Sequence, residues 1–208
     1  MSDQSNSVDI FNSVKEFESK LSLPDGFYDK LLHEDDWSFT IKMSALFEAA
    51  CTHALITKLN TPELEKSFSQ LDQANSSYGK VTLLKCLNLI YPEQADFLTK
   101  LASLRNNFVH NVSNVELTFD QLIEAMDDNQ KKAFVKWVGH GIVEKAVVGE
   151  SSVTRNSMVL ENPKLSIWIT AAEVLACLYL EVDIAERLHS QLGAISKELI
   201  SALLTKES

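Results

Sequence analysis

The chain contains few of the residues that let a backbone turn sharply. Among its 208 residues there are 6 glycines and 4 prolines. Small β-sandwiches and β-barrels need many tight turns, in which these two residues are enriched, so their scarcity argues against such folds. Alanine, leucine, lysine and glutamate recur at helical spacing instead. We therefore expect an all-α protein with one hydrophobic core.

Cysteine is scarce as well. The three cysteines, Cys51, Cys86 and Cys177, are odd in number, far apart and embedded in apolar runs. This pattern indicates reduced core residues of a cytosolic protein rather than a disulfide framework or a metal site. The sequence also contains no phosphate-binding loop, dinucleotide fingerprint or nucleophile elbow. We therefore expect neither a metal nor a cofactor.

Positively charged residues are also scarce. The chain has 19 lysines and arginines against 29 acidic residues, which gives a formal net charge of −10. Proteins that coat DNA or bind anionic membranes need the opposite balance. Any contact with nucleic acid should therefore be local. The polar segment Met1–Ser7 lacks the pattern of a signal peptide, and charged residues interrupt the apolar runs. These features predict a cytoplasmic protein with no membrane segment.

The apolar spacing predicts a series of helices. They cover residues 8–21, 34–59, 62–71, 79–91, 92–112, 131–148, 163–188 and 192–204, with a loop over 149–163. Thr118 and Gln121 have the spacing of a capping box and predict a further helix start. We expect a four-helix up-and-down bundle within residues 1–115. Residues 116–208 then form a helical extension that packs on the same domain or on a second copy.

Only three arginines occur in the chain, and one of them lies close to a histidine. Arg105 is followed directly by Asn106 and, five residues later, by His110. A guanidinium group stays charged at all physiological pH values, whereas an imidazole titrates near neutrality. This pair of side chains suits chemistry on a phosphodiester.

A helical projection at about 100° per residue predicts where the pair points. The apolar residues of this helix that lie within about 60° of one another, and so form its buried face, are Phe97, Leu101, Leu104 and Phe108. Arg105 lies on the flank of that face. Asn106 and His110, four residues apart, share a face almost opposite to it. His110 should therefore face either water or another chain.

A solvated arginine and histidine near a helix end are the simpler interpretation. The alternative is that this face meets its symmetry mate, so that a two-fold axis brings two Arg/His sets into one cleft. Leu98, Ala102 and Val109 would then add apolar contact area to a homodimer.

The segment Leu104–His110 resembles the R-x4-6-H motif of the HEPN superfamily, in which a polar residue such as Asn106 commonly follows the arginine. The preceding pattern is similar too: a long apolar helix carries Glu48, Gly79 opens a third helix, and the motif lies on the fourth. HEPN groups similar to mannitol-operon repressors and to abortive-infection proteins share this outline. The resemblance covers about residues 35–115 and assigns no subfamily.

The resemblance implies a homodimeric, metal-independent endoribonuclease, of the kind found among toxins and phage-defence proteins. His110 would act as general base or acid, Arg105 would hold the scissile phosphate, and Asn106 would orient either of them. RNA cleavage would leave 2′,3′-cyclic phosphate and 5′-hydroxyl ends. An acidic residue on an early helix often contacts the motif arginine, which gives Glu48 a place in the site. Pairing of Glu48 with Lys42, or exposure to water, is the alternative.

A second function class stays open. The superfamily also contains catalytically silent members that serve as interaction modules. The acidic charge and the unassigned residues 116–208 favour such an interaction or regulatory protein, with an antitoxin or another protein as its partner.

Other chemically suggestive residues have simpler interpretations. Glu186 and His189 have the spacing of a di-iron ligand pair, but the second copy of that pair is missing, so a chance surface pair is favoured. His140, between two glycines, either marks a loop near a site or lies where a helix frays. His53 fits a core or boundary position. The tryptophans Trp37, Trp137 and Trp168 are best explained as packing anchors.

Overall fold

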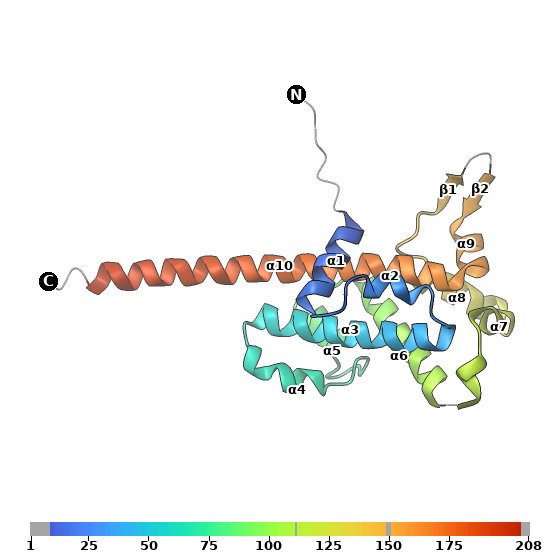
Figure 1. The fold of residues 1–208 in the computed structure, drawn as a ribbon, viewed down its shortest axis with the longest axis horizontal. Helices are drawn as coiled ribbons and strands as arrows, with labels where there is room; N and C mark the ends of the chain where they lie inside the picture. Colours follow the sequence, from blue (N-terminus) through green and yellow to red (C-terminus); the bar gives the residue numbers. More distant parts are fainter. Residues whose placement is uncertain (1–8, 111, 149–150, 205–208) are drawn as a thin grey trace, which may run out of the picture.

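The structure of the chain, a computed structural model, describes residues 9–110, 112–148 and 151–204. The expectation for the polar segment Met1–Ser7 lies outside these residues. The described part is mostly helical, which confirms the all-α class, and its only strands form one short hairpin. The last and longest helix, α10, packs against elements from both the start and the middle of the chain (Figure 1).

The elements have the following bounds. The helices are α1 (Ile10–Lys20), α2 (Phe27–Leu31), α3 (Asp36–Leu59), α4 (Glu65–Ser69), α5 (Lys80–Cys86), α6 (Pro92–His110), α7 (Phe119–Glu124), α8 (Asp128–Val138), α9 (Arg155–Glu161) and α10 (Pro163–Leu204). Two 3-10 helices, η1 (Pro62–Leu64) and η2 (Val112–Glu116), follow α3 and α6. Strands β1 (Lys145–Val148) and β2 (Ser151–Thr154) pair antiparallel, with Lys145 opposite Thr154.

Helix α3 is the centre of the core. It starts at Asp35, whose carboxylate accepts the backbone N–H of Ser38 at 2.8 Å, and it ends at Asn60 in the left-handed conformation. Its buried apolar residues occupy about half of the helix circumference at about 100° per residue; they are Phe39, Met43, Leu46, Phe47, Ala50, Cys51, Ala54 and Leu55. On the other side of the helix, Lys42, Ala45 and Ala49 are exposed. Helices α10, α6, α5 and α4 pack against α3.

Helix α10 packs along both α1 and α3, with which it makes its most extensive contacts (Figure 1). Its buried side chains in this part include Ile167, Ala171, Val174, Leu175, Leu178 and Val182. Trp168 stacks between Phe11 and Tyr28, with ring centroids 5.3 and 5.0 Å away, and its indole N–H donates to the Tyr28 carbonyl. The first half of α10 is therefore part of the main core.

The second half of α10 continues past the body as a single rod (Figure 1). By length and composition this helix could cross a membrane, but more than half of its most apolar window is buried inside the protein. The core helix of a soluble protein passes the same test. Glu173 and Glu181, two of the charged residues that interrupt the apolar sequence of α10, lie within this helix and do not end it.

Asp36 joins three segments that are far apart in the sequence. One carboxylate oxygen pairs with the ammonium of Lys164 at 2.7 Å, at the start of α10. The other accepts the backbone N–H of Phe119 at 2.8 Å, at the start of α7. The predicted capping box of Thr118 and Gln121 is present at the same place. The first turns of α3, α7 and α10 are thus held at one point.

The largest difference from the expected elements lies between α8 and α10. A single helix over residues 131–148 is wrong: α8 ends at Gly139, where an added Cβ would lie 2.5 Å from the Val135 carbonyl oxygen. Residues 145–148 form β1, which is rich in the β-branched residues that favour strands. Most of the expected loop is also ordered, as β2 and α9, although residues 149–150 lie outside the described part.

Smaller corrections concern helix ends and one cysteine. The two expected C-terminal helices are one, because the single Gly193 costs a helix only about 1 kcal/mol and does not end it. Helix α5 ends earlier than expected, since Asn88 adopts a positive φ of 55°. The short α2 was not expected. Cys51 is buried and Cys177 partly so, but Cys86 is exposed and is not the core residue that its apolar surroundings suggested.

A partly buried polar network connects α6, the turn after α8, and α10. The Glu173 carboxylate lies 3.2 Å from His140 Nε2, and it accepts hydrogen bonds from Gln94 at 2.8 Å and from the Cys177 thiol at 3.4 Å. Burial alone would raise the pKa of Glu173, but the hydrogen bonds from His140, Gln94 and Cys177 outweigh it and lower that pKa. His140 is therefore a structural residue and neither frays nor marks a mobile loop.

The Glu173→Gln variant tests this network. The folded-state pKa of Glu173 lies below the ordinary value of 4.5, so its contribution to stability is present above that pH and is lost as the pH falls through the lower, folded value. We expect a loss of about 1–3 kcal/mol in the free energy of unfolding at pH 7, shrinking towards zero near pH 3. Urea denaturation at both pH values measures it. An equal loss at both pH values would contradict the role of the ionised Glu173 carboxylate in this network. The control is Glu181→Gln, because Glu181 forms only a long ion pair of 3.8 Å with Lys58.

Candidate functional site: Glu48, Arg105, Asn106 and His110

Helix α6 carries the Arg/His motif and is fixed at both ends. It begins at Pro92, where the Gln94 side chain accepts the N–H of Tyr91 at 3.0 Å. The predicted inner face is confirmed, since Phe97, Leu101, Leu104 and Phe108 are all buried. At its end, the Phe108 carbonyl accepts the indole N–H of Trp37 at 3.3 Å. The motif therefore projects from a helix whose rotation is set by the core.

Arg105 forms an ion pair with Glu48 of the neighbouring helix α3. The distance from Nη2 to Oε1 is 2.6 Å. The other terminal nitrogen, Nη1, donates to the side-chain oxygen of Asn106 at 3.0 Å. Both charged side chains are about one-third exposed, at 35% and 36%. Three of the four predicted site residues, Glu48, Arg105 and Asn106, thus lie together. The expected alternative for Glu48, pairing with Lys42, is wrong, because Lys42 pairs with Glu34.

His110 is exposed and lies apart from the arginine of its own chain. Asn106, one turn earlier on α6, is exposed too, which agrees with the predicted outward face. Arg105 and His110 are five residues apart, so they differ by about 140° around the helix and about 7.5 Å along it. His110 makes no hydrogen bond or ion pair with any other residue that the structure describes. Its imidazole is available to another molecule.

The apolar surface around the motif is smaller than the sequence suggested. Leu98 is only 1% exposed and belongs to the core, so it cannot contribute to a contact between copies. Ala102 is partly buried, whereas Val109, beside His110, is 42% exposed. An interface at this face would therefore be mainly polar.

Glu48 also borders a groove to which the motif helix α6 contributes no residue. This groove of about 460 Å³ is lined by residues of α1, α3, α4 and α5, including His53 and Lys80. Lys80 is 2% exposed, and its ammonium donates to the carbonyl oxygens of Glu48 and Ser69 at 3.4 Å. Its charge thus lies beneath the turn of α3 that carries Glu48. No local sequence pattern marks Lys80 as a buried residue.

His53 is half-buried in the wall of that groove, as a boundary histidine would be. Burial lowers its pKa below the ordinary value, and its Nε2 atom has no hydrogen-bond partner among the described residues. A neutral imidazole is the favoured form there. His53 is accordingly unsuited to hold a phosphate by charge.

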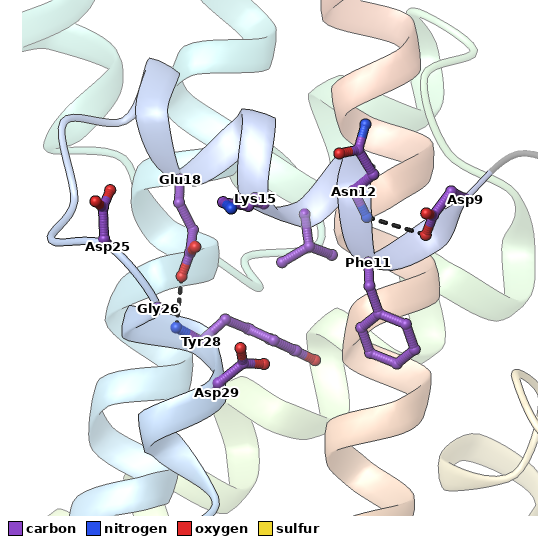
Figure 2. A pocket seen from close by; sticks show the side chains of 10 residues that line it. Asp9, Phe11, Asn12, Lys15, Glu18, Asp25, Gly26, Tyr28 and Asp29 are labelled. Carbon is purple, nitrogen blue, oxygen red and sulfur yellow. Dashed lines mark hydrogen bonds between the residues drawn. The ribbon is translucent and has the colours of Figure 1, made fainter.

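A second cavity, of about 470 Å³, lies between α1 and the loop before α2 (Figure 2). Its lining carries the carboxylates of Asp9, Glu18, Asp25 and Asp29 and the ammonium of Lys15. Glu18 accepts the Tyr28 N–H, and burial raises the pKa of its carboxyl group. A cavity with this lining repels phosphate and contains none of the motif residues.

The other suggestive pairs have ordinary structural partners. Glu186 pairs with Lys20 at 2.6 Å, and His189 Nε2 lies 3.1 Å from the Thr57 carbonyl oxygen. Among the described residues, no group of three or more His, Cys, Asp or Glu side chains could hold a metal ion. The three tryptophans pack against the core as expected.

Comparisons of the chain with protein-family models, with curated proteins and with solved structures found no match.

The position of the Glu48–Arg105 pair predicts a small contribution to stability. Exposed ion pairs contribute about 0–1 kcal/mol, because water screens the charges and two side chains lose freedom. We expect Glu48→Gln to change the free energy of unfolding by less than about 1 kcal/mol in guanidinium denaturation. Phe108→Ala, on the buried face of the same region, should cost about 3–5 kcal/mol. A loss above 2 kcal/mol for Glu48→Gln would show that the pair holds the fold.

Proposed function

We propose that this protein is a HEPN-type, metal-independent endoribonuclease that acts as a homodimer. The observation that carries the proposal is the cluster of Glu48, Arg105 and Asn106 on two packed helices, with His110 exposed one turn beyond Asn106. A stabilising role alone would not require an arginine at the surface, flanked by two polar groups that fix its position.

The proposed reaction is an attack of a ribose 2′-hydroxyl on the adjacent phosphorus. His110 removes the 2′-hydroxyl proton, or gives a proton to the leaving 5′-oxygen. As the 2′-oxygen bonds to phosphorus, the bond from phosphorus to the 5′-oxygen breaks. The products are a 2′,3′-cyclic phosphate and a 5′-hydroxyl. Arg105 donates to the non-bridging oxygens and stabilises their growing charge.

Glu48 and Asn106 are positioning residues in this proposal. A guanidinium group carries five N–H donors, and the two contacts with Glu48 and Asn106 leave others for a phosphate. Holding the arginine before substrate binds reduces the ordering that the transition state requires. The same ion pair offsets part of the positive charge, which suits an enzyme that must release its anionic product.

A second copy is needed because one chain does not bring the reacting groups together. Arg105 and His110 point about 140° apart around α6. A two-fold axis beside the exposed face of α6 would place His110 of one copy near Arg105 of the other. Such a contact would be mainly polar, since Val109 is its exposed apolar residue next to the histidine.

RNA cleavage in the presence of EDTA is the direct test. We expect the purified protein to cut single-stranded RNA without a divalent metal and to leave the two end groups named above. His110→Ala should reduce cleavage by at least about 100-fold, the usual contribution of a general acid or base. His33→Ala, at an exposed histidine on the loop after α2, should cleave normally.

Two results would contradict the proposal. One is equal cleavage by the wild-type protein and by His110→Ala, which would indicate a contaminating nuclease. The other is cleavage at a site whose ribose has been replaced by deoxyribose, because the nucleophile is then missing.

Mixing two inactive variants tests whether the site is shared. Arg105→Ala keeps His110, and His110→Ala keeps Arg105, so a mixed dimer contains one cleft with both groups intact. We expect activity to return when the two variants are mixed and allowed to exchange subunits, and neither variant to be active alone. If mixing restores nothing while size measurements show mixed dimers, the site lies within a single chain.

The catalytically silent alternative has one observation in its favour. The Glu48 carboxylate lies 2.6 Å from Arg105 and so competes with a phosphate for the guanidinium. The chain would then act as an interaction or regulatory protein whose exposed α6 face binds a protein partner. Failure to cleave RNA, together with partner binding that Arg105→Ala leaves unchanged, would favour that function.

A further inference from the structure

The second half of α10 carries an apolar stripe that the protein itself does not cover. Beyond the salt bridge of Glu186 with Lys20 and the contact of His189 with Thr57, the helix leaves the body and continues to Leu204 (Figure 1). The apolar stripe is defined as the following side chains, each between 51% and 68% exposed: Ile184, Leu188, Leu192, Ile195, Leu199 and Leu203. A helix with such a stripe is stabilised mainly by packing against another surface.

The stripe is narrow and straight. At about 100° per residue its members lie within an arc of about 100°. Outside the stripe, Ile200 is the one large apolar side chain of this segment, 57% exposed, and the other positions are small or polar, among them Ser190 and Ala194. This pattern is that of a helix that packs against one other helix, and not that of a helix surrounded on all sides.

The spacing along the stripe is symmetric about the point between Gly193 and Ala194. Successive members are separated by 4, 4, 3, 4 and 4 residues. If an identical helix lies antiparallel with its midpoint at the same place, every apolar residue faces an apolar residue. The facing pairs are Ile184 with Leu203, Leu188 with Leu199, and Leu192 with Ile195. A two-fold axis through this midpoint makes the surface its own complement.

The charges beside the stripe fit the same arrangement. Arg187 and Glu198 lie on one flank, within about 20° of each other around the helix. In the antiparallel pair, Arg187 of one copy and Glu198 of the other are offset along the helix axis by only two residues, or about 3 Å. Symmetry repeats this contact at the other end. Opposite charges at such flanking positions set the orientation of paired helices.

A membrane fits the segment less well than a second helix. Helices that lie on membranes are rich in lysine and arginine on the polar face. Between Ile184 and Leu203 the cations Arg187 and Lys197 are matched by Glu186 and Glu198. The overall charge of −10 also disfavours an anionic lipid surface.

We infer that the projecting half of α10 pairs antiparallel with the same segment of a second copy of this chain, through the apolar stripe. This contact is distinct from the one proposed at the motif. Trp37 and Lys164 lie at the end of the body where α6 finishes, whereas Thr57 and His189 mark the opposite end, where α10 leaves it. The α10 pair therefore leaves both motif faces exposed.

Measurement of mass in solution tests the pairing. Multi-angle light scattering of the full chain should give at least twice 23.3 kDa. The double variant Leu192→Glu/Ile195→Glu places like charges at the centre of the pair and should halve that mass. The matched control Ser190→Glu/Ala194→Glu, on the opposite side of the same turns, should keep the wild-type mass. The substituted side chains are all exposed in the single chain, so thermal unfolding of the body should be unchanged.

Spin labels test the direction of the pair. The labels are placed on cysteines introduced singly at Ala194 or Asp183, with Cys86 and Cys177 replaced by serine. Antiparallel pairing puts the two labels at Ala194 at nearly the same level along the helices, and offsets the two labels at Asp183 by about 32 Å along the helix axis. Parallel pairing would give similar, short separations at both positions and would overturn the antiparallel arrangement.

Three further outcomes would overturn the inference. They are a wild-type protein of 23.3 kDa at 100 µM, an unchanged mass in the stripe variant, and a single-copy protein that sediments with vesicles of zwitterionic and anionic phospholipid through the stripe. RNA cleavage is a separate readout: if no form of the protein cuts RNA, the masses still decide the pairing. If the stripe variant cuts RNA normally, the motif contact does not depend on α10.

Discussion

The need to cover the buried face of α3 is the constraint on which the rest of this structure depends. That face spans about half of the helix circumference, so each helix that packs on it must turn its own apolar face inward. Helix α10 covers one side with its first half and α6 covers another. Because α6 must present Phe97, Leu101 and Phe108 to this core, its opposite face, with Asn106 and His110, has to face outward. The exposure of the candidate site follows from the packing of the core.

Arg105 of the candidate site lies on the flank of α6, at the boundary between its buried face and its exposed face. Arg105 is neither on the buried face nor opposite it, and from that position it reaches Glu48, which lies on α3 at a similar boundary. The two helices bring together a pair of charges that water still partly screens. Such a pair adds little stability, yet it fixes the direction of a guanidinium group. The acidic chain thus presents one oriented positive charge.

Local patterns could predict the elements whose signals lie within a few residues. The carboxylate of Asp35 and the capping box at Thr118 mark helix starts that the structure has, and the 3.6-residue period located the inner face of α6. The hairpin was missed because Val147 and Val148 fit a buried helix as well as a strand. Nothing local distinguishes a glycine that ends a helix, such as Gly139, from one that does not, such as Gly193.

The candidate site was predictable only in part, for the same reason. Arg105, Asn106 and His110 share one helix, so their relative directions follow from helical geometry. The partner of Glu48 lies 57 residues away, and choosing between Lys42 and Arg105 requires the packing of two helices. The buried Lys80 and the hydrogen bonds of Glu173 depend on three or more elements at once. No pattern within one segment contains that information.

Because α10 is synthesised long after α3, its position in the sequence affects how the chain folds during translation. Helix α3 is complete at Leu59, but the helix that covers one of its sides begins only at Pro163, about 100 residues later. At about 5–20 residues per second, ribosomes need ~5–20 s to make that stretch. Throughout this interval the α10-facing side of α3 is exposed in the growing chain. The nascent protein should therefore depend on chaperones that shield apolar helices until its last helix emerges.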